Sequence, residues 1–194
     1  MRLFFALPIS RDWEKIFEHY RDRHGNIPYL RWTPLRNLHI TVLFLGDVDD
    51  VALPEIQKRA REVAAATSRF ALALERVQYA PPESRARMVW AYLTPESAYV
   101  DLVLELARTM SEISAGLDDL KRELLEDGAN VLPHLTLARF RSDMPYPKEL
   151  RKLSRTEREG DLLFVSELVL FESTLGDRGH PPTYHALDTF PFEV

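Results

Sequence analysis

Two short motifs in this chain each place a threonine two residues after a histidine. The first contains His39 and Thr41, and the second contains His134 and Thr136. Imidazoles titrate near neutral pH, so one histidine can accept a proton while another donates one. A threonine hydroxyl can donate a hydrogen bond to an oxygen on which negative charge develops. Two such pairs around one phosphate would supply metal-free acid–base chemistry at phosphorus from opposite sides.

Each motif stands at the start of an apolar segment that reads as a β-strand, over residues 38–45 and 134–140. Side chains alternate between the two faces of a strand, so the histidine and the threonine of each motif share a face. If a pseudo-twofold axis relates the two motifs, their polar faces can meet across a cleft. The alternative is a buried histidine and threonine that bond each other or the backbone. The same parity directs Arg139 away from the second motif, where we expect an ion pair behind the sheet.

The hydrophobic pattern around the motifs gives the same order of segments twice, strand–helix–strand–helix–strand. It predicts an α+β fold with two pseudo-symmetric lobes, antiparallel sheets flanked by helices and an active-site cleft between the lobes. We expect a single bilobal domain over residues 1–194, with half-units of about 1–81 and 82–194. The predicted strands cover residues 2–8, 38–45, 70–79, 87–93, 134–140, 162–171 and 184–187, and the predicted helices begin near residues 10, 54 and 95.

Composition narrows the class of protein. The chain has 194 residues, 45% of them hydrophobic, which is enough apolar material for a packed interior. There is no cysteine, which excludes disulfides, thiolate zinc sites and a cysteine nucleophile and fits a cytoplasmic location. No segment has the length of a membrane span or of a signal sequence. The net charge of −5 argues against a protein that coats DNA.

The motifs and their surroundings resemble a known family. The two His-x-Thr-x segments are similar to the paired motifs of the 2H phosphoesterase superfamily. Their context resembles the RNA 2′,3′-cyclic phosphodiesterases once named 2′-5′ RNA ligases, and residues 167–187 resemble that family's closing hairpin. The segments that carry the resemblance are RLFFA (2–6), Arg31-Trp32, NLHITVLFLGDV (37–48) and PHLTLAR (133–139).

This resemblance implies hydrolysis of a terminal 2′,3′-cyclic phosphate to a 2′-phosphate in a central cleft. It implies that His39 is the proton donor and His134 the proton acceptor, and we expect the hydroxyls of Thr41 and Thr136 to bind the phosphate. No metal and no cofactor is expected. The expected partner is an RNA with a 2′,3′-cyclic phosphate end, such as a tRNA-like fragment, or a small cyclic nucleotide, bound by a monomer. Trp32 and Tyr184 could stack on a base or pack at the rim of the cleft.

Other functions remain open or are excluded by missing motifs. The chain lacks the closely spaced histidines of histidine-triad hydrolases, a phosphate-binding Gly-Lys-Ser/Thr loop and the lysine motif of ATP-dependent ligases. Two alternatives use the same residues or the same cleft. One is the reverse reaction, in which RNA ends are joined through a 2′-5′ bond. The other is a module that binds RNA ends without turnover, although such a module would not need two titratable groups.

Overall fold

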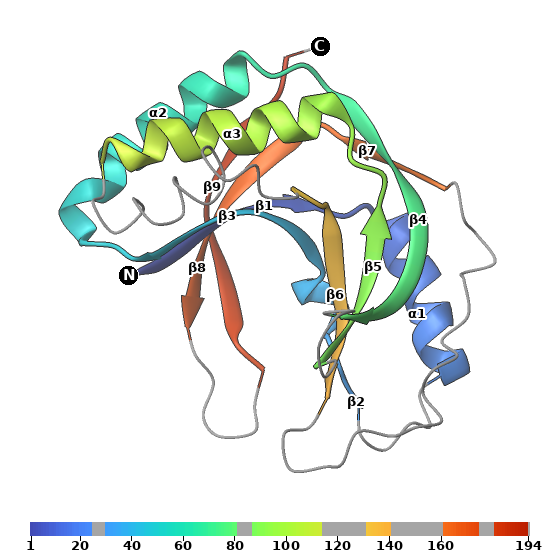
Figure 1. Cartoon of the computed structure of the whole chain (residues 1–194). Helices are drawn as coiled ribbons and strands as arrows, with labels where there is room; N and C mark the ends of the chain where they lie inside the picture. Colours follow the sequence, from blue (N-terminus) through green and yellow to red (C-terminus); the bar gives the residue numbers. More distant parts are fainter. Residues whose placement is uncertain (25–29, 81–86, 114–130, 141–160, 175–180, 194) are drawn as a thin grey trace.

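The computed structural model describes residues 1–24, 30–80, 87–113, 131–140, 161–174 and 181–193 (Figure 1). Its strands are β1 (Arg2–Pro8), β2 (Leu30–Trp32), β3 (His39–Asp47), β4 (Phe70–Ala80), β5 (Met88–Leu93), β6 (His134–Phe140), β7 (Leu162–Val165), β8 (Glu167–Thr174) and β9 (Thr183–Pro191). Its helices are α1 (Arg11–His24), α2 (Leu53–Ala65) and α3 (Ser97–Ser111), with short 3-10 turns η1 (Leu35–Asn37) and η2 (Asp50–Ala52).

The strands form one nine-stranded sheet in the order β7-β4-β5-β6-β3-β1-β8-β9, with β2 paired to β6. Neighbouring strands pair antiparallel throughout. The predicted α+β class with antiparallel strands and flanking helices is therefore confirmed.

A single residue pair joins two groups of four strands in the middle of this sheet. β3 and β6 pair through Ile40 and Leu135, and both side chains are fully buried. From this pair, β3, β1, β8 and β9 extend one way, and β6, β5, β4 and β7 extend the other. The first group contains both early and late segments of the chain, because the late strand β8 pairs with β1 and β9 pairs with β8 (Figure 1). The strands β4 to β7, which lie between them in the sequence, form the second group. The expected boundary near Pro81 lies outside the described residues.

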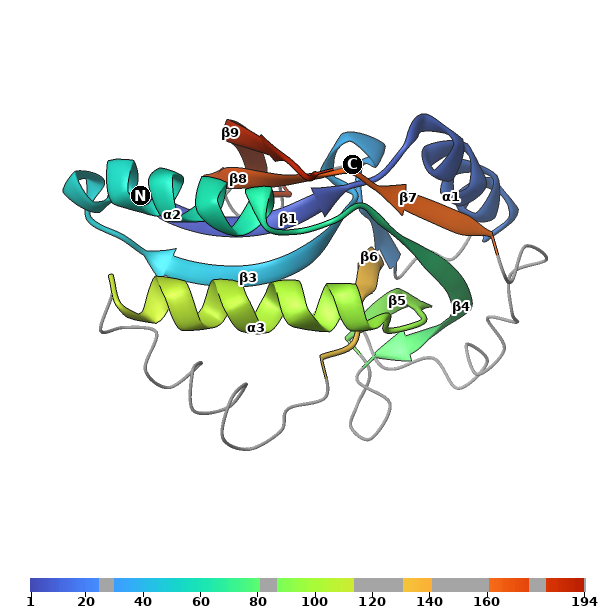
Figure 2. The same ribbon diagram turned by 90° about the horizontal axis from the view of Figure 1, so that it is seen from above.

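The helices cover the sheet with apolar stripes. In α1 the Oγ of Ser10 accepts a hydrogen bond from the N–H of Trp13, as an N-cap residue does. α2 has a proline in its first turn, where the missing N–H costs nothing. α2 and α3 lie side by side over one end of the sheet, and α1 lies apart from them beside β4 and β7 (Figure 2). The buried helix residues include Trp13, Phe17 and Tyr20 in α1, Ile56, Ala60 and Val63 in α2, and Tyr99, Val103, Leu106 and Met110 in α3.

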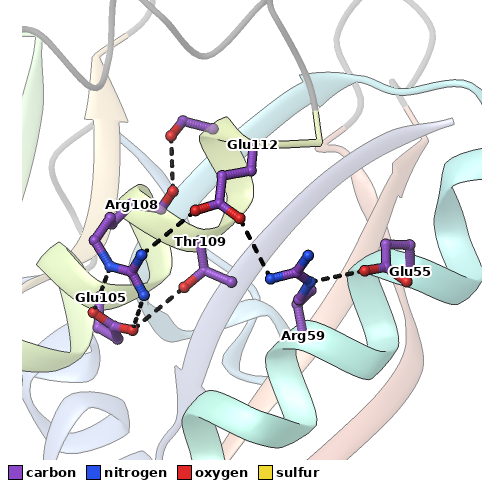
Figure 3. Close-up of polar contacts among 7 residues, drawn as sticks. Glu55, Arg59, Glu105, Arg108, Thr109 and Glu112 are labelled. Carbon is purple, nitrogen blue, oxygen red and sulfur yellow. Dashed lines mark hydrogen bonds and ion pairs between the residues drawn. The ribbon is translucent and has the colours of Figure 1, made fainter.

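An ion-pair network links α2 to α3 on their outer side (Figure 3). Arg59 of α2 contacts Glu55 at 2.7 Å and Glu112 at 3.4 Å. Glu112 also contacts Arg108, which pairs with Glu105 at 2.6 Å. Exposed pairs of this kind contribute little to stability, so the network mainly fixes the relative position of two helices that apolar packing already holds.

Two features of the sheet differ from the predictions. The short strand β2 was not predicted, because three residues are too few for a hydrophobic pattern to emerge. The predicted strand 162–171 is two strands, since the chain changes partner at Ser166: β7 pairs with β4, and β8 pairs with β1. The sequence marks this change of partner only by the polar pair Ser166-Glu167 within an otherwise apolar run. No helix among the described residues is long and apolar enough to cross a membrane.

Candidate active site

Both predicted motifs line one cavity of about 590 Å³. This volume lies within the range of small-molecule sites in proteins. His39 and Thr41 of β3 form part of the wall, and His134 and Thr136 of β6 form another part. The described lining also holds two arginines, several aromatic side chains and no carboxylate.

The register between β3 and β6 arranges the two motifs almost symmetrically. The strands run antiparallel through the residue pair that joins the two groups of strands. On antiparallel strands, the residue before one member of a pair lies opposite the residue after the other member. His39 therefore lies across from Thr136, and Thr41 lies across from His134. The structure thus brings all four predicted residues together at one place.

Matching backbone contacts orient both imidazoles. Nδ1 of His39 lies 2.8 Å from the carbonyl oxygen of Asn37, and Nδ1 of His134 lies 3.0 Å from the carbonyl oxygen of Leu132. A carbonyl can only accept, so Nδ1 of each ring carries a hydrogen. In each histidine, Nε2 is then the atom that takes up or releases a proton.

Both motif strands contain an extra residue directly after the threonine. The register between β1 and β3 skips Val42, and the register between β5 and β6 skips Leu137. A β-bulge of this kind reverses the alternation of faces for the residues that follow it. Phe44 and Arg139, each five residues after its histidine, consequently line the same cavity.

The expected position of Arg139 behind the sheet is therefore wrong, because the bulge at Leu137 turns its side chain to the cavity. Arg139 pairs across the sheet with Met88, and its Nη1 lies 3.1 Å from the Met88 sulfur. It forms no ion pair with any residue of the described ranges. Its charge instead faces the space between the two motifs.

His39 is held in a largely apolar setting. Its ring lies 5.1 Å from the ring of Phe4, between centroids. Burial lowers the pKa of His39 to about 4, against the opposing effect of the Asn37 carbonyl, and the charges of His134 and Arg139 lower the pKa further. In the free protein His39 is thus neutral at pH 7.

His134 stacks on Trp90, a residue that the sequence analysis did not select. The ring centroids lie 3.9 Å apart and the planes meet at 26°. Burial lowers the pKa of His134, and its bond to the carbonyl of Leu132 opposes this shift. Trp90 is the cross-strand partner of Thr136, so it reaches the site from the neighbouring strand β5. The sequence held one signal for Trp90. On the predicted strand 87–93, Met88 and Trp90 alternate with small or apolar residues, which places both on the same face.

The two predicted rim residues also line the cavity. Tyr184 meets the ring of His39 edge-on, with centroids 5.2 Å apart. Trp32 packs edge-on against Tyr20 at 6.2 Å, and its Nε1 is buried without a hydrogen-bond partner among the described residues. Tyr184 therefore forms part of the cavity wall beside His39. Stacking of Tyr184 or Trp32 on a base stays a prediction.

Two hydrogen bonds hold the segment that precedes His39 in place. The side-chain amide of buried Asn37 donates to the carbonyl of Pro182 at 2.9 Å. The hydroxyl of Thr33 donates to the carbonyl of Thr136 at 2.7 Å. The first bond connects the segment before β3 to Pro182, just before β9, and the second connects the same segment to β6.

The side chains at this site suit proton transfer around an anion. Two imidazoles with free Nε2 atoms and two hydroxyl groups face a cavity whose described wall is cationic. No group of three or more histidine, cysteine or carboxylate side chains that could hold a metal ion occurs in the described part of the chain.

Comparison with known proteins places the sequence in one family. Residues 8–177 match the model of the 2′-5′ RNA ligase superfamily. A protein of Archaeoglobus fulgidus named RNA 2′,3′-cyclic phosphodiesterase is 26% identical over 190 residues, which cover 98% of this chain and 99% of that protein. A Geobacillus stearothermophilus protein with the same name is 25% identical over 191 residues and 97% of this chain. The match spans 56% of the Geobacillus protein's length.

Solved structures show the same fold. The crystal structure of TT0787 from Thermus thermophilus superposes with a TM-score of 0.81 at 23% identity, covering 99% of this chain and 98% of that one. This likeness concerns the course of the backbone.

Proposed function

Because the chain belongs to the 2′-5′ RNA ligase superfamily, we propose that it hydrolyses the 2′,3′-cyclic phosphodiester at an RNA end to a 2′-phosphomonoester. The observation that carries this proposal is the near-symmetric pair of histidines, each with Nδ1 bonded to a carbonyl and with Nε2 left for proton transfer. The names of the Archaeoglobus and Geobacillus relatives support the substrate class.

In the proposed reaction, Nε2 of His134 takes a proton from water as the water oxygen bonds to phosphorus. The bond from phosphorus to the 3′ oxygen breaks, and Nε2 of His39 delivers a proton to that oxygen. The sum is the addition of one water molecule. Afterwards His134 is protonated and His39 is neutral, so both return to their starting states by exchange with solvent.

The threonines and the substrate charge complete the mechanism. The hydroxyls of Thr41 and Thr136 donate to the phosphoryl oxygens on which charge develops. His39 has to be protonated before the 3′ oxygen leaves, although its pKa in the free protein is about 4. An anionic phosphate bound beside it favours the imidazolium and raises this pKa. Substrate binding thus favours the protonated form of His39, which is the acid that the reaction requires.

The test is product analysis. The protein is incubated with cytidine 2′,3′-cyclic phosphate, and the product is identified by phosphorus NMR. We expect a 2′-monophosphate from the wild type and none from a double His39→Ala, His134→Ala variant purified in the same way, which controls for contaminating ribonuclease. Absence of wild-type turnover both of this nucleotide and of an oligoribonucleotide with a 2′,3′-cyclic phosphate end would refute the proposed activity. A 3′-monophosphate would show that the 2′ oxygen leaves instead. The cytoplasmic location and the monomeric state stay predictions.

A further inference from the structure

The bulge in β6 turns two successive carbonyl groups toward the same neighbouring segment. In a regular antiparallel strand, successive carbonyls point to opposite edges of the strand. At the extra residue Leu137 this alternation is interrupted. The carbonyls of Thr136 and Leu137 consequently both face the segment that follows β2, and each accepts a hydrogen bond from it. The threonine of the second motif thus lies at the least regular point of its strand.

A single residue, Thr33, supplies both of these hydrogen bonds. Its N–H donates to the carbonyl of Leu137 at 2.9 Å, and its hydroxyl donates to the carbonyl of Thr136 at 2.7 Å. β2 ends at Trp32, so the pairing of β2 with β6 continues through one backbone bond and one side-chain bond of the next residue. Thr33 therefore holds the bulge from the edge of β6 that faces away from β5.

The neighbours of Thr33 restrict its conformation. Pro34 follows it, and a residue before proline is confined to extended backbone. The β-branched side chain of threonine also has few accessible rotamers. The carbonyl of Pro34 accepts a hydrogen bond from the N–H of Asn37 at 2.8 Å, which closes the turn η1. The hydroxyl of Thr33 is therefore aimed at β6 by a stiff segment.

This hydroxyl is poorly suited to bind the substrate itself, although Thr33 lines the cavity. A hydroxyl has one hydrogen to donate, and the carbonyl of Thr136 takes it. The lone pairs that remain are acceptors, which repel an anionic phosphate. Any contribution of the Thr33 hydroxyl to the reaction therefore passes through the strand that it contacts.

The first motif has a similar contact, built from a different element. The extra residue Val42 follows Thr41 in β3. The carbonyl of Thr41 accepts a hydrogen bond from the hydroxyl of Tyr99, a buried residue of α3, at 3.3 Å. In both motifs a hydroxyl from outside the strand thus bonds the carbonyl beside the bulge. The recurrence indicates that this carbonyl needs a partner that the sheet does not supply.

We propose that Thr33 is a positioning residue of the reaction, which acts through the backbone carbonyl of Thr136 to direct the Thr136 hydroxyl at the phosphate. The carbonyl and the side chain branch from the same Cα, so a tilt of this peptide unit would move the hydroxyl away from the phosphoryl oxygen. Small misplacements of a group that stabilises the transition state are costly in rate. The inference rests on the proposed function, because it assigns a residue to that reaction.

The test is a double-mutant cycle in the whole chain, with cytidine 2′,3′-cyclic phosphate or an oligoribonucleotide with a 2′,3′-cyclic phosphate end as substrate. Thr33→Val keeps the volume and the backbone N–H but removes the hydroxyl, and kcat should fall on the order of 10-fold. KM should change little. Thr33→Ser keeps a hydroxyl and should retain most of the rate. In a Thr136→Val background, Thr33→Val should cause no further loss, because the hydroxyl that it directs is already absent.

Thr67→Val is the matched control. The hydroxyl of Thr67 also donates to a backbone carbonyl, that of Val63 at 2.8 Å, but Thr67 lies just after α2 and does not line the cavity. This variant should keep the wild-type kcat. Thermal melting of every variant shows that it is folded, and Thr33→Ala gives the same comparison if Thr33→Val melts below the assay temperature.

The outcomes separate this inference from the proposed function. A wild-type kcat in Thr33→Val, or equal losses in Thr33→Val and Thr33→Ser, would overturn the positioning role and leave the hydrolase intact. An undiminished loss in the Thr136→Val background would also overturn it, because Thr33 would then act through the segment that leads to His39. If the wild type hydrolyses neither substrate, the proposed function is refuted, and the role of Thr33 is refuted with it.

Discussion

The indole of Trp90 lies against the imidazole of His134, with ring centroids 3.9 Å apart. The stack fixes the plane of the imidazole, and the hydrogen bond from Nδ1 to the Leu132 carbonyl fixes its rotation within that plane. His39 has a comparable bond to Asn37 but is bordered by Phe4 and by the edge of Tyr184. The two histidines therefore share their backbone contact and differ in the side chains that hold the ring.

Replacement of Trp90 by leucine should release the ring of His134 and lower kcat by roughly 10-fold to 100-fold, because small misplacements of a catalytic group are costly. Trp90→Phe keeps an aromatic face and should recover most of the rate. Steady-state kinetics with cytidine 2′,3′-cyclic phosphate measures both, and thermal melting checks the fold. A wild-type kcat in Trp90→Leu would show that the stack does not position His134.

Replacement of His39 or His134 by alanine should each remove most of the rate, since a general acid or base typically contributes 10²–10⁴-fold. The double variant should lose much less than the product of the single losses, because the two groups act in one step. A substrate with a far better leaving group needs no general acid. It should rescue His39→Ala and leave His134→Ala slow.

Rescue of His134→Ala alone by this substrate would mean that the two roles are reversed. Wild-type activity in either single variant would instead assign that histidine to the structure rather than to the reaction.

Loss of the hydroxyl of Thr41 or Thr136 should lower kcat by on the order of 10-fold to 1,000-fold, the upper end being typical for one oxyanion donor. Thr→Val removes the hydroxyl with little change of volume, and Thr→Ser keeps it. At each position the valine variant should be slow and the serine variant close to wild type. Equal rates for the two variants would exclude hydrogen bonding as the role of that residue.

The pH dependence follows from the direction of both shifts. The pKa values of His39 and His134 in the free protein lie below the usual 6.5. Above pH 6.5 both histidines are thus neutral and the acid is lost, so kcat/KM should fall about tenfold per pH unit there. The bound anionic phosphate raises both pKa values, and the optimum of kcat should therefore lie at higher pH than that of kcat/KM. A kcat/KM profile that still rises from pH 7 to pH 8 would contradict this.

Activity should survive excess EDTA. The chain has no cysteine, and the cavity wall, as far as the structure describes it, carries no carboxylate. Assays of cyclic phosphate hydrolysis with and without EDTA, at equal ionic strength, give the answer. Loss of activity that Mg²⁺, Mn²⁺ or Zn²⁺ restores would show the two-histidine mechanism to be incomplete.

Strand parity explains which side chains of the cavity could be placed from the sequence and which could not. His39, Thr41, His134 and Thr136 were found because regular alternation holds from each histidine to its threonine. Beyond the threonine it breaks, and nothing about Leu137 marks it as a bulge, because the extra residue arises only from its pairing with β5. Arg139 was misplaced for that reason.

Contacts between distant segments were equally out of reach. Trp90 could be assigned to a strand, but its position beside His134 depends on the pairing of β5 with β6. At the change of partner the sequence has only the polar pair Ser166-Glu167, which does not show that β7 and β8 pair with different strands. Hydrophobic periodicity indicates which residues of one strand share a face. It does not indicate which other strand pairs with that strand.

The position of β1 between β3 and β8 affects the order in which the molecule can be completed. β1 can pair with β3 early in synthesis, but its other edge waits for β8, where Leu3 meets Glu172. Pairings between such distant parts of a chain form slowly. Pro182, whose carbonyl holds Asn37 beside His39, follows β8 in the chain. A nascent chain therefore exposes both histidines well before the first is locked in place, and catalytic competence should be among the last properties that it acquires on the ribosome.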